Sequence, residues 1–206
     1  MNRVDLILEH PKYQEYLDKI KQAEEKRIFC LHNMNHFLDV ARIAYIMNLE
    51  EELGIAKEII YATALLHDIG RKFGKRHLGH VSDGYSYMMK LDYPDAARIC
   101  LTHSFNDMKI EGYVGSFDTT EEETELIRTK LQEVVPDDYD QLIQLCDAIS
   151  GSEGVMDIIE RMSDVKRRYG DYDLGKWNKN LELKAYFEKR MDRNLYEAVE
   201  KDTFHN

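Results

Sequence analysis

The chain has little that would crosslink or interrupt it. It contains 3 prolines and 11 glycines in 206 residues, so long helical segments can form without a break. Its 3 cysteines, Cys30, Cys100 and Cys146, are odd in number, far apart and set beside apolar residues, and no CxxC pair occurs. We therefore predict buried, reduced thiols, which excludes a disulfide framework and a zinc–thiolate cluster.

Long apolar runs are missing as well. No stretch approaches the roughly 20 apolar residues of a membrane span, and residues 1–10 carry charges too early for a secretory signal peptide. Positive charge is also scarce, because the net charge is −11. General nucleic-acid binders need a basic surface. We therefore expect a cytoplasmic protein with neither a nucleic-acid nor a membrane partner.

Helical periodicity is what the chain has instead. Pro11 stands at an expected first helical position, and apolar residues follow it at helical spacing. Thr119 and Glu122 offer a capping box. Period-two strands are not evident, so we predict an all-α fold, with further helices near 33–49, 55–69, 80–92, 94–103, 120–134, 137–150, 154–168 and 177–201.

The most informative motif is an apolar run that ends in His67 and Asp68. The run Ala64-Leu65-Leu66 is expected to be buried, and it delivers an imidazole and a carboxylate to one point. Burial of both groups without partners is costly. A divalent cation removes that cost, because neutral imidazole and carboxylate are both metal ligands.

Two further residues have similar surroundings. His36 starts an amphipathic helical stretch, and Asp147 lies inside another apolar helical stretch. Taken one by one, they could be core histidines and a capping or paired aspartate. In the order His36, His67-Asp68, Asp147, however, the chain resembles the HD superfamily of metal-dependent phosphohydrolases.

This resemblance implies a fold and a domain organisation. The fold would be an HD-domain helical bundle with helical N- and C-terminal extensions. The length suits a single domain over 1–206. Within it, we expect the metal-ligand core at 32–150 and the C-terminal helical extension at 151–206.

Two more histidines extend the motif. His80 opens an expected helix and His103 ends another. Both match positions at which some members of the superfamily hold a second metal ion, and the full set resembles the six-ligand site of the bacterial hydrolases that cleave diadenosine tetraphosphate symmetrically. His77 is an alternative to His80, and a histidine at a helix end such as His103 also complements the helix dipole. The resemblance implies that Asp68 bridges two ions held by His36, His67, Asp68, His80, His103 and Asp147.

The ligand types and the resemblance together indicate cofactors and chemistry. Mixed imidazole and carboxylate ligands suit two divalent transition-metal ions, Fe, Mn, Co or Zn, better than calcium or magnesium. The resemblance implies a phosphohydrolase in which a metal-activated water attacks a nucleotide, a dinucleoside polyphosphate or another small phosphate ester. Two alternatives are a di-iron oxygenase of the same superfamily and a regulatory module that binds a nucleotide without turnover.

A cluster of cations follows the motif directly. Arg71, Lys72, Lys75 and Arg76 fall within six residues. We predict that they bind substrate phosphate, and that Arg71 and Lys72 act with Asp68 in catalysis by stabilising the developing charge. The alternative is that they complement a helix dipole and are otherwise solvated.

Other segments carry weaker signals. His32 and His36 have the spacing of a zincin helix, but the Glu of the HExxH motif is absent. We expect His32 to contact substrate or to support a ligand, with a half-exposed helix histidine as the alternative. Aromatic residues of the loop 104–118 either stack on a base or pin the loop. The run Lys166-Arg167-Arg168 is expected to be a solvated face.

Overall fold

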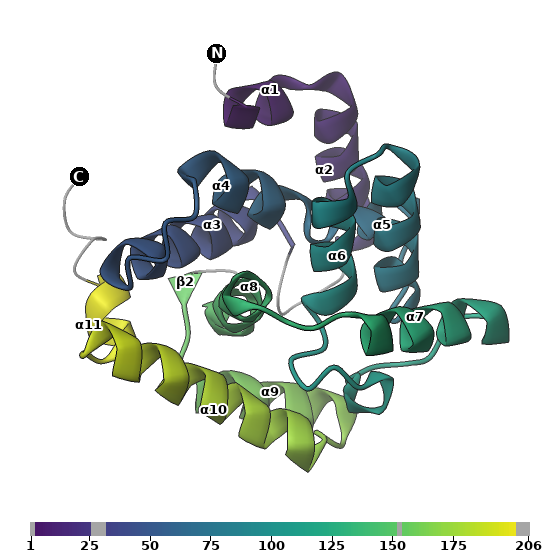
Figure 1. The fold of residues 1–206 in the computed structure, drawn as a ribbon. Helices are drawn as coiled ribbons and strands as arrows, with labels where there is room; N and C mark the ends of the chain where they lie inside the picture. The colour runs from purple at the N-terminus through teal and green to yellow at the C-terminus, as the bar shows by residue number, and fades with distance from the viewer. Residues whose placement is uncertain (1–2, 26–31, 152–153, 201–206) are drawn as a thin grey trace.

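The computed structural model describes residues 3–25, 32–151 and 154–200, and within them it confirms the all-α prediction. Figure 1 shows the helices and the short strand β2. The elements are α1 (Arg3–Glu9), α2 (Pro11–Ala23), α3 (Met34–Glu50), α4 (Lys57–Leu66), the 3₁₀ helix η1 (Ile69–Phe73), α5 (Gly79–Lys90), α6 (Pro94–Thr102), the 3₁₀ helix η2 (Ile110–Gly112), α7 (Glu121–Glu133), α8 (Asp138–Ile149), β1 (Ser150–Gly151), β2 (Gly154–Val155), α9 (Ile158–Tyr169), α10 (Leu174–Met191) and α11 (Leu195–Glu200).

Local sequence signals explain where several helices begin. Pro11 and Pro94 are the first residues of α2 and α6, as predicted. The capping box of α7 lies one residue later than the sequence predicts, since Thr120 and Glu123 form it. Thr119 instead contacts the hydroxyl of Thr124. Side-chain caps of this kind satisfy amide groups at a helix start that would otherwise have no partner.

Three elements differ from the sequence prediction. The helix expected over 55–69 ends at Leu66, and a 3₁₀ helix follows Asp68. The helix expected over 177–201 is divided at Asp192, which adopts a left-handed conformation with φ 50°. The β1–β2 hairpin pairs Ser150 with Val155, and its strands are too short to show a period-two pattern.

Cys100 and Cys146 are buried free thiols as predicted, and Cys30 lies outside the described residues.

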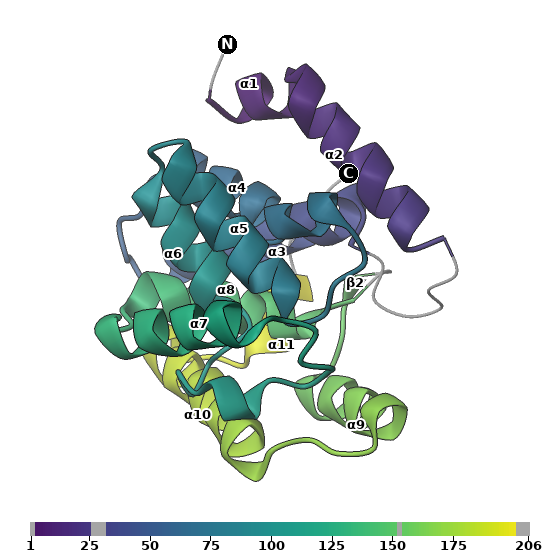
Figure 2. The same ribbon diagram turned by 90° about the vertical axis from the view of Figure 1, so that its right-hand side faces the viewer.

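The helices are arranged around α8. In Figures 1 and 2, α1 and α2 lie at one end of the molecule and the α9–α10 pair lies at the opposite end, with α8 between them. The largest apolar cluster joins α3, α4 and α8 to the C-terminal helices, and it includes Met47, Leu145 and Phe187. None of the helices formed by the described residues combines the length and apolar character that crossing a membrane requires.

A buried polar network holds α6 against α8. Asp140 is fully buried and receives hydrogen bonds from Arg98 and from the Thr102 hydroxyl, the latter at 3.0 Å. Gln144, one turn later, donates from its side-chain amide to the Thr102 carbonyl at 2.9 Å. Because a buried charge without partners is expensive, this network fixes the C-terminal end of α6 relative to α8.

Gly70 allows η1 to approach α5 closely. A Cβ atom built at Gly70 would lie 1.9 Å from the His80 carbonyl oxygen and 2.6 Å from the Gly84 amide nitrogen. Both atoms belong to the backbone, so they cannot rotate away as a side chain would. Only glycine permits this approach, which sets the start of α5 beside Asp68.

We predict that Gly70→Ala lowers the free energy of unfolding by about 3 kcal/mol or more, because the added methyl group forces two backbones apart. Gly175→Ala is the matched control. Its added Cβ would meet side-chain atoms rather than backbone, with Asp173 Oδ1 at 2.9 Å. That oxygen caps α10, so the loss should not exceed that of an N-cap, about 0.5 to 2 kcal/mol. Urea denaturation of the two variants measures the difference, and equal stabilities would contradict the close approach.

Candidate metal centre

Six side chains predicted as ligands come together at helix ends. His36 lies in the first turn of α3, where its amide donates to the N-cap residue Asn33 at 2.9 Å. His67 follows α4, and Asp68 precedes η1. The other three are His80 at the start of α5, His103 directly after α6 and Asp147 in the last turn of α8.

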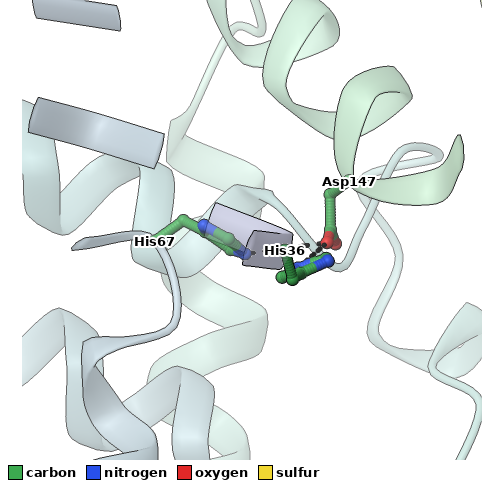
Figure 3. Close-up of side chains that lie close together, drawn as sticks. All are labelled: His36, His67 and Asp147. Atoms are coloured by element: carbon green, nitrogen blue, oxygen red, sulfur yellow. Dashed lines mark ion pairs between the residues drawn. The ribbon is translucent and has the colours of Figure 1, made fainter. Parts of the chain in front are cut away.

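The first group of ligands consists of His36, His67 and Asp147. Asp147 Oδ1 lies 3.2 Å from His36 Nε2 and 3.6 Å from His67 Nε2. Figure 3 shows the Asp147 carboxylate pointing from its helix toward His36, with the His67 ring approaching from another segment. The ligand atoms of these three residues lie within 4.8 Å of one another.

The second group consists of Asp68, His80 and His103, and its ligand atoms also lie within 4.8 Å of one another. Asp68 Oδ1 is 3.2 Å from His80 Nε2 and 3.4 Å from His103 Nε2. Its other oxygen, Oδ2, lies 3.8 Å from His67 Nε2 in the first group. Asp68 therefore stands between the two groups, as a bridging carboxylate would.

Backbone hydrogen bonds fix the tautomers of three of these histidines. His67 Nδ1 donates to the Ala64 carbonyl at 2.7 Å, and His103 Nδ1 donates to the Cys100 carbonyl at 2.9 Å. His80 Nδ1 makes the same contact with the His77 carbonyl. Since a carbonyl only accepts, the proton sits on Nδ1 and each Nε2 is left as a lone-pair donor to a metal.

The resulting lone pairs face one another. Nε2 of His80 and Nε2 of His103 are 3.3 Å apart, and both face the Asp68 carboxylate. His36 Nε2, His67 Nε2 and Asp68 Oδ1 are buried without a hydrogen-bond partner. Acceptors that face acceptors repel one another unless a cation lies between them. The donor set therefore fits divalent metal ions.

Despite burial, the Asp147 and Asp68 carboxylates raise the pKa of His67. The pKa values of Asp68 and His80 shift in the direction that metal ligands require. Burial alone would raise the pKa of Asp68, but Arg71 and the surrounding histidines hold it well below its usual range. Burial and the nearby Arg71 keep the pKa of His80 well below its usual value. Both residues therefore have the protonation states of metal ligands at neutral pH.

His77 is not part of either group. Its backbone amide donates to Asp118 at 2.5 Å, and its ring packs edge-on against Tyr169 with centroids 6.2 Å apart. The geometry therefore favours His80 over His77 as the third donor beside Asp68 and His103.

His32 supports Asp68 from the side opposite His80 and His103. Its Nδ1 donates to Glu24 at 2.6 Å, and its Nε2 lies 3.3 Å from Asp68 Oδ2. The side chain is buried, which lowers the pKa of His32 to about 4 despite the neighbouring carboxylates. His32 is therefore a neutral buried histidine, and the half-exposed alternative is wrong.

The four predicted phosphate-binding cations have separate positions. Arg71 Nε lies 2.8 Å from Asp68 Oδ2. Lys75 and Arg76 line the cavity beside the ligands, and Arg76 also pairs with Asp83 and Glu123. Lys72 points elsewhere, with its ammonium group 4.0 Å from the centre of the Tyr87 ring. The prediction that Lys72 contacts substrate is therefore corrected, because its charge packs on an aromatic face instead.

The ligands open into a cavity of about 560 Å³, a volume typical of small-molecule sites. His80, His103 and Asp147 reach its wall, and Tyr113 and Tyr169 add aromatic surface. Phe105 is fully buried and packs on Tyr113. Of the two alternatives for the loop aromatics, Phe105 therefore follows the second and pins the loop to the core. Tyr113 itself faces the cavity.

Sequence reasoning missed three cations of this cavity. Arg161, Arg168 and Lys176 line it from α9 and from the first turn of α10. The expectation of a solvated face holds for Arg167, whose side chain is 75% exposed, but is wrong for Arg168, whose side chain is 20% exposed. The seven-residue spacing of Arg161 and Arg168 places both on one helix face and was an available signal.

Comparisons with known proteins agree with the ligand pattern. A family model described as "HD domain" matches residues 33–152. An uncharacterized protein of Clostridium beijerinckii (strain ATCC 51743 / NCIMB 8052) is 58% identical over 71 residues, which are 34% of this chain and 45% of that protein. The chain is thus matched to less than half of that relative's length. No solved structure gives a significant match.

We predict that the purified protein retains about two transition-metal ions per chain. Three protein ligands suit one catalytic ion that keeps open positions, and the site has two such groups. His80→Ala should lower the content to about one ion. His77→Ala is the matched control and should keep both. Elemental analysis of the dialysed proteins measures this. A wild-type content of one ion that His80→Ala leaves unchanged would contradict the two-group site.

Proposed function

The chain belongs to the HD domain family, and we propose that it is a metal-dependent phosphohydrolase that acts on a small phosphorylated substrate. A nucleotide or a dinucleoside polyphosphate is the substrate class that suits its cavity best. One observation carries the proposal. Two groups of metal-ligand side chains meet at Asp68, and His80, His103 and Asp147 of these groups line a cavity that cations also line. A site built in this way can hold a phosphate against a binuclear centre.

The residues assign the metal positions and the chemistry. His36, His67 and Asp147 would hold one ion and His80 and His103 the other, with Asp68 shared. When bound, the ions would polarise a phosphoryl oxygen and lower the pKa of an attacking water. Because imidazole nitrogen dominates the set, iron, manganese, cobalt or zinc is expected rather than calcium or magnesium.

Arg71 has the position required to stabilise charge at phosphorus. Its guanidinium pairs with Asp68 at 2.8 Å, lies 3.4 Å from His80 Nε2 and also lines the cavity. A planar guanidinium can contact a carboxylate and a phosphate at the same time. We infer that Arg71 orients Asp68 and neutralises the charge that develops on the phosphoryl group.

The aromatic wall favours a nucleotide over a bare phosphate. Tyr113 contacts His80 with ring centroids 6.5 Å apart and faces the cavity, so a base could stack beside the reacting group. A close relation to the diadenosine tetraphosphate hydrolases is part of this proposal and rests on the shared order of the six ligands.

The complete ligand set separates the proposal from one of its two rivals. A regulatory module without turnover has no need for a full set of ligands around a bridging carboxylate. A di-iron oxygenase would use the same side chains, so the test must distinguish the two reactions. Phosphate release from a panel of nucleotides, measured together with oxygen consumption, does so. Oxygen uptake without phosphate release would overturn the proposal.

We predict that Asp68→Asn lowers phosphate release by at least about a thousandfold, because the neutral amide removes the charge that both ions share while it keeps the shape of the side chain. Metal content should fall as well. Asp138→Asn is the control, since Asp138 lies at the opposite end of α8 from Asp147, pairs with Arg190 and does not line the cavity. Near-normal turnover by Asp68→Asn would exclude the proposed centre.

We also predict that Arg71→Ala lowers kcat/KM by about 10- to 100-fold, the loss expected when a charge-assisted contact worth about 1.5 to 3 kcal/mol is removed. Lys72→Ala should lower it by less than about threefold, because its ammonium group packs on Tyr87. Steady-state kinetics and metal analysis of both variants test this. If Arg71→Ala loses metal and activity in parallel, its role is to hold Asp68 rather than the phosphate.

A further inference from the structure

The C-terminal helices add positive charge to the cavity from outside the matched family region. Residues 33–152 match the HD domain, whereas Arg161 and Arg168 lie on α9 and Lys176 lies in α10. All three line the cavity that the ligands His80, His103 and Asp147 also reach. Figure 2 shows α9 and α10 at the end of the molecule away from α1 and α2.

Arg161 has donors that the protein leaves unused. Its Nε and Nη1 atoms are buried and have no hydrogen-bond partner among the described residues. Val165 and Arg168 follow it along the same helix face and also line the cavity. Buried guanidinium donors usually have a hydrogen-bond acceptor. The unpaired donors of Arg161 are therefore suited to bind an anionic ligand.

Lys176 brings a second charge close to the metal ligands. Its ammonium group donates to the Ser104 carbonyl at 2.8 Å, and Ser104 directly follows His103. One hydrogen bond leaves other ammonium donors available, since the group has three. Lys176 therefore lines the cavity beside the residue that follows His103.

Acidic groups cancel only part of this charge. Among the described lining residues, six are Lys or Arg and two are Glu or Asp. Arg71, Arg76 and Arg168 each pair with a carboxylate outside the lining. Arg161 and Lys176 form no ion pair within the part of the chain that the structure describes, so their charge faces the cavity uncompensated. In a chain of net charge −11, such a local excess of cations indicates a ligand with more negative charge than one phosphate carries.

We propose that Arg161, Arg168 and Lys176 form a second phosphate subsite, so that the substrate carries at least one phosphoryl group beyond the one that is attacked. This inference rests on the proposed function. It assigns the C-terminal extension a direct part in selecting the substrate. Nucleoside diphosphates and longer phosphate chains fit the two subsites, and monophosphates fill only one.

The test measures binding as well as turnover. Titration calorimetry on the metal-loaded protein compares tripolyphosphate with orthophosphate, and ADP with AMP. We expect the longer ligand of each pair to bind at least 100-fold more tightly. Arg161→Gln and Lys176→Met, made separately, should each reduce this preference at least tenfold, with metal content checked after each titration because polyphosphates chelate metals.

Matched controls come from the same helices. Arg167→Gln removes an exposed charge next to Arg168, and Lys179→Met removes a lysine that pairs with Glu182. Both should leave the preference unchanged. Equal binding of mono- and polyphosphates by the wild type, or an equal loss of both in the variants, would overturn the subsite. Tight binding without phosphate release from any nucleotide would instead overturn the proposed function and leave the subsite in place.

Discussion

The carboxylate of Asp68 is the group on which the arrangement of the site depends. It is only 1% exposed, and a buried carboxylate without compensation is very costly. Arg71 compensates part of this charge, and the metal ions that His67, His80 and His103 would share with Asp68 would compensate the rest. These side chains belong to different parts of the chain. Each of these segments must end or begin at the same point, so the packing of the helices and the chemistry of the site have one common cause.

Helix ends are suited to this task. A histidine at or just beyond a helix end can donate Nδ1 to a carbonyl three residues earlier, as His67 and His103 do. That bond satisfies a backbone acceptor that the helix leaves without a partner. It also turns Nε2 outward as an unprotonated ligand. The same contact therefore terminates the helix and prepares the ligand.

The sequence was sufficient to predict the helical fold from its periodicity. The order of the His and Asp residues, with its resemblance to the HD superfamily, was sufficient to select the six side chains that come together in the two groups. The sequence could not separate Arg71 from Lys72, since the difference arises from the 3₁₀ conformation of η1. With about three residues per turn, residue 71 lies above residue 68 and residue 72 is turned away. That ending of α4 depends on the close contact of Gly70 with α5, which joins segments through tertiary packing.

The C-terminal cations show a different limit. Arg161 and Arg168 share a helix face by their spacing alone, yet only the packing of α9 shows that this face lines the cavity. Their placement also bears on the net charge of the proposed metal site. Two divalent ions would bring four positive charges, and the carboxylates of Asp68 and Asp147 would cancel only two of them. Arg71 and the C-terminal cations increase that excess, so a monoanionic ligand would leave most of it uncompensated, whereas a phosphate chain that extends toward α9 would neutralise it along its length.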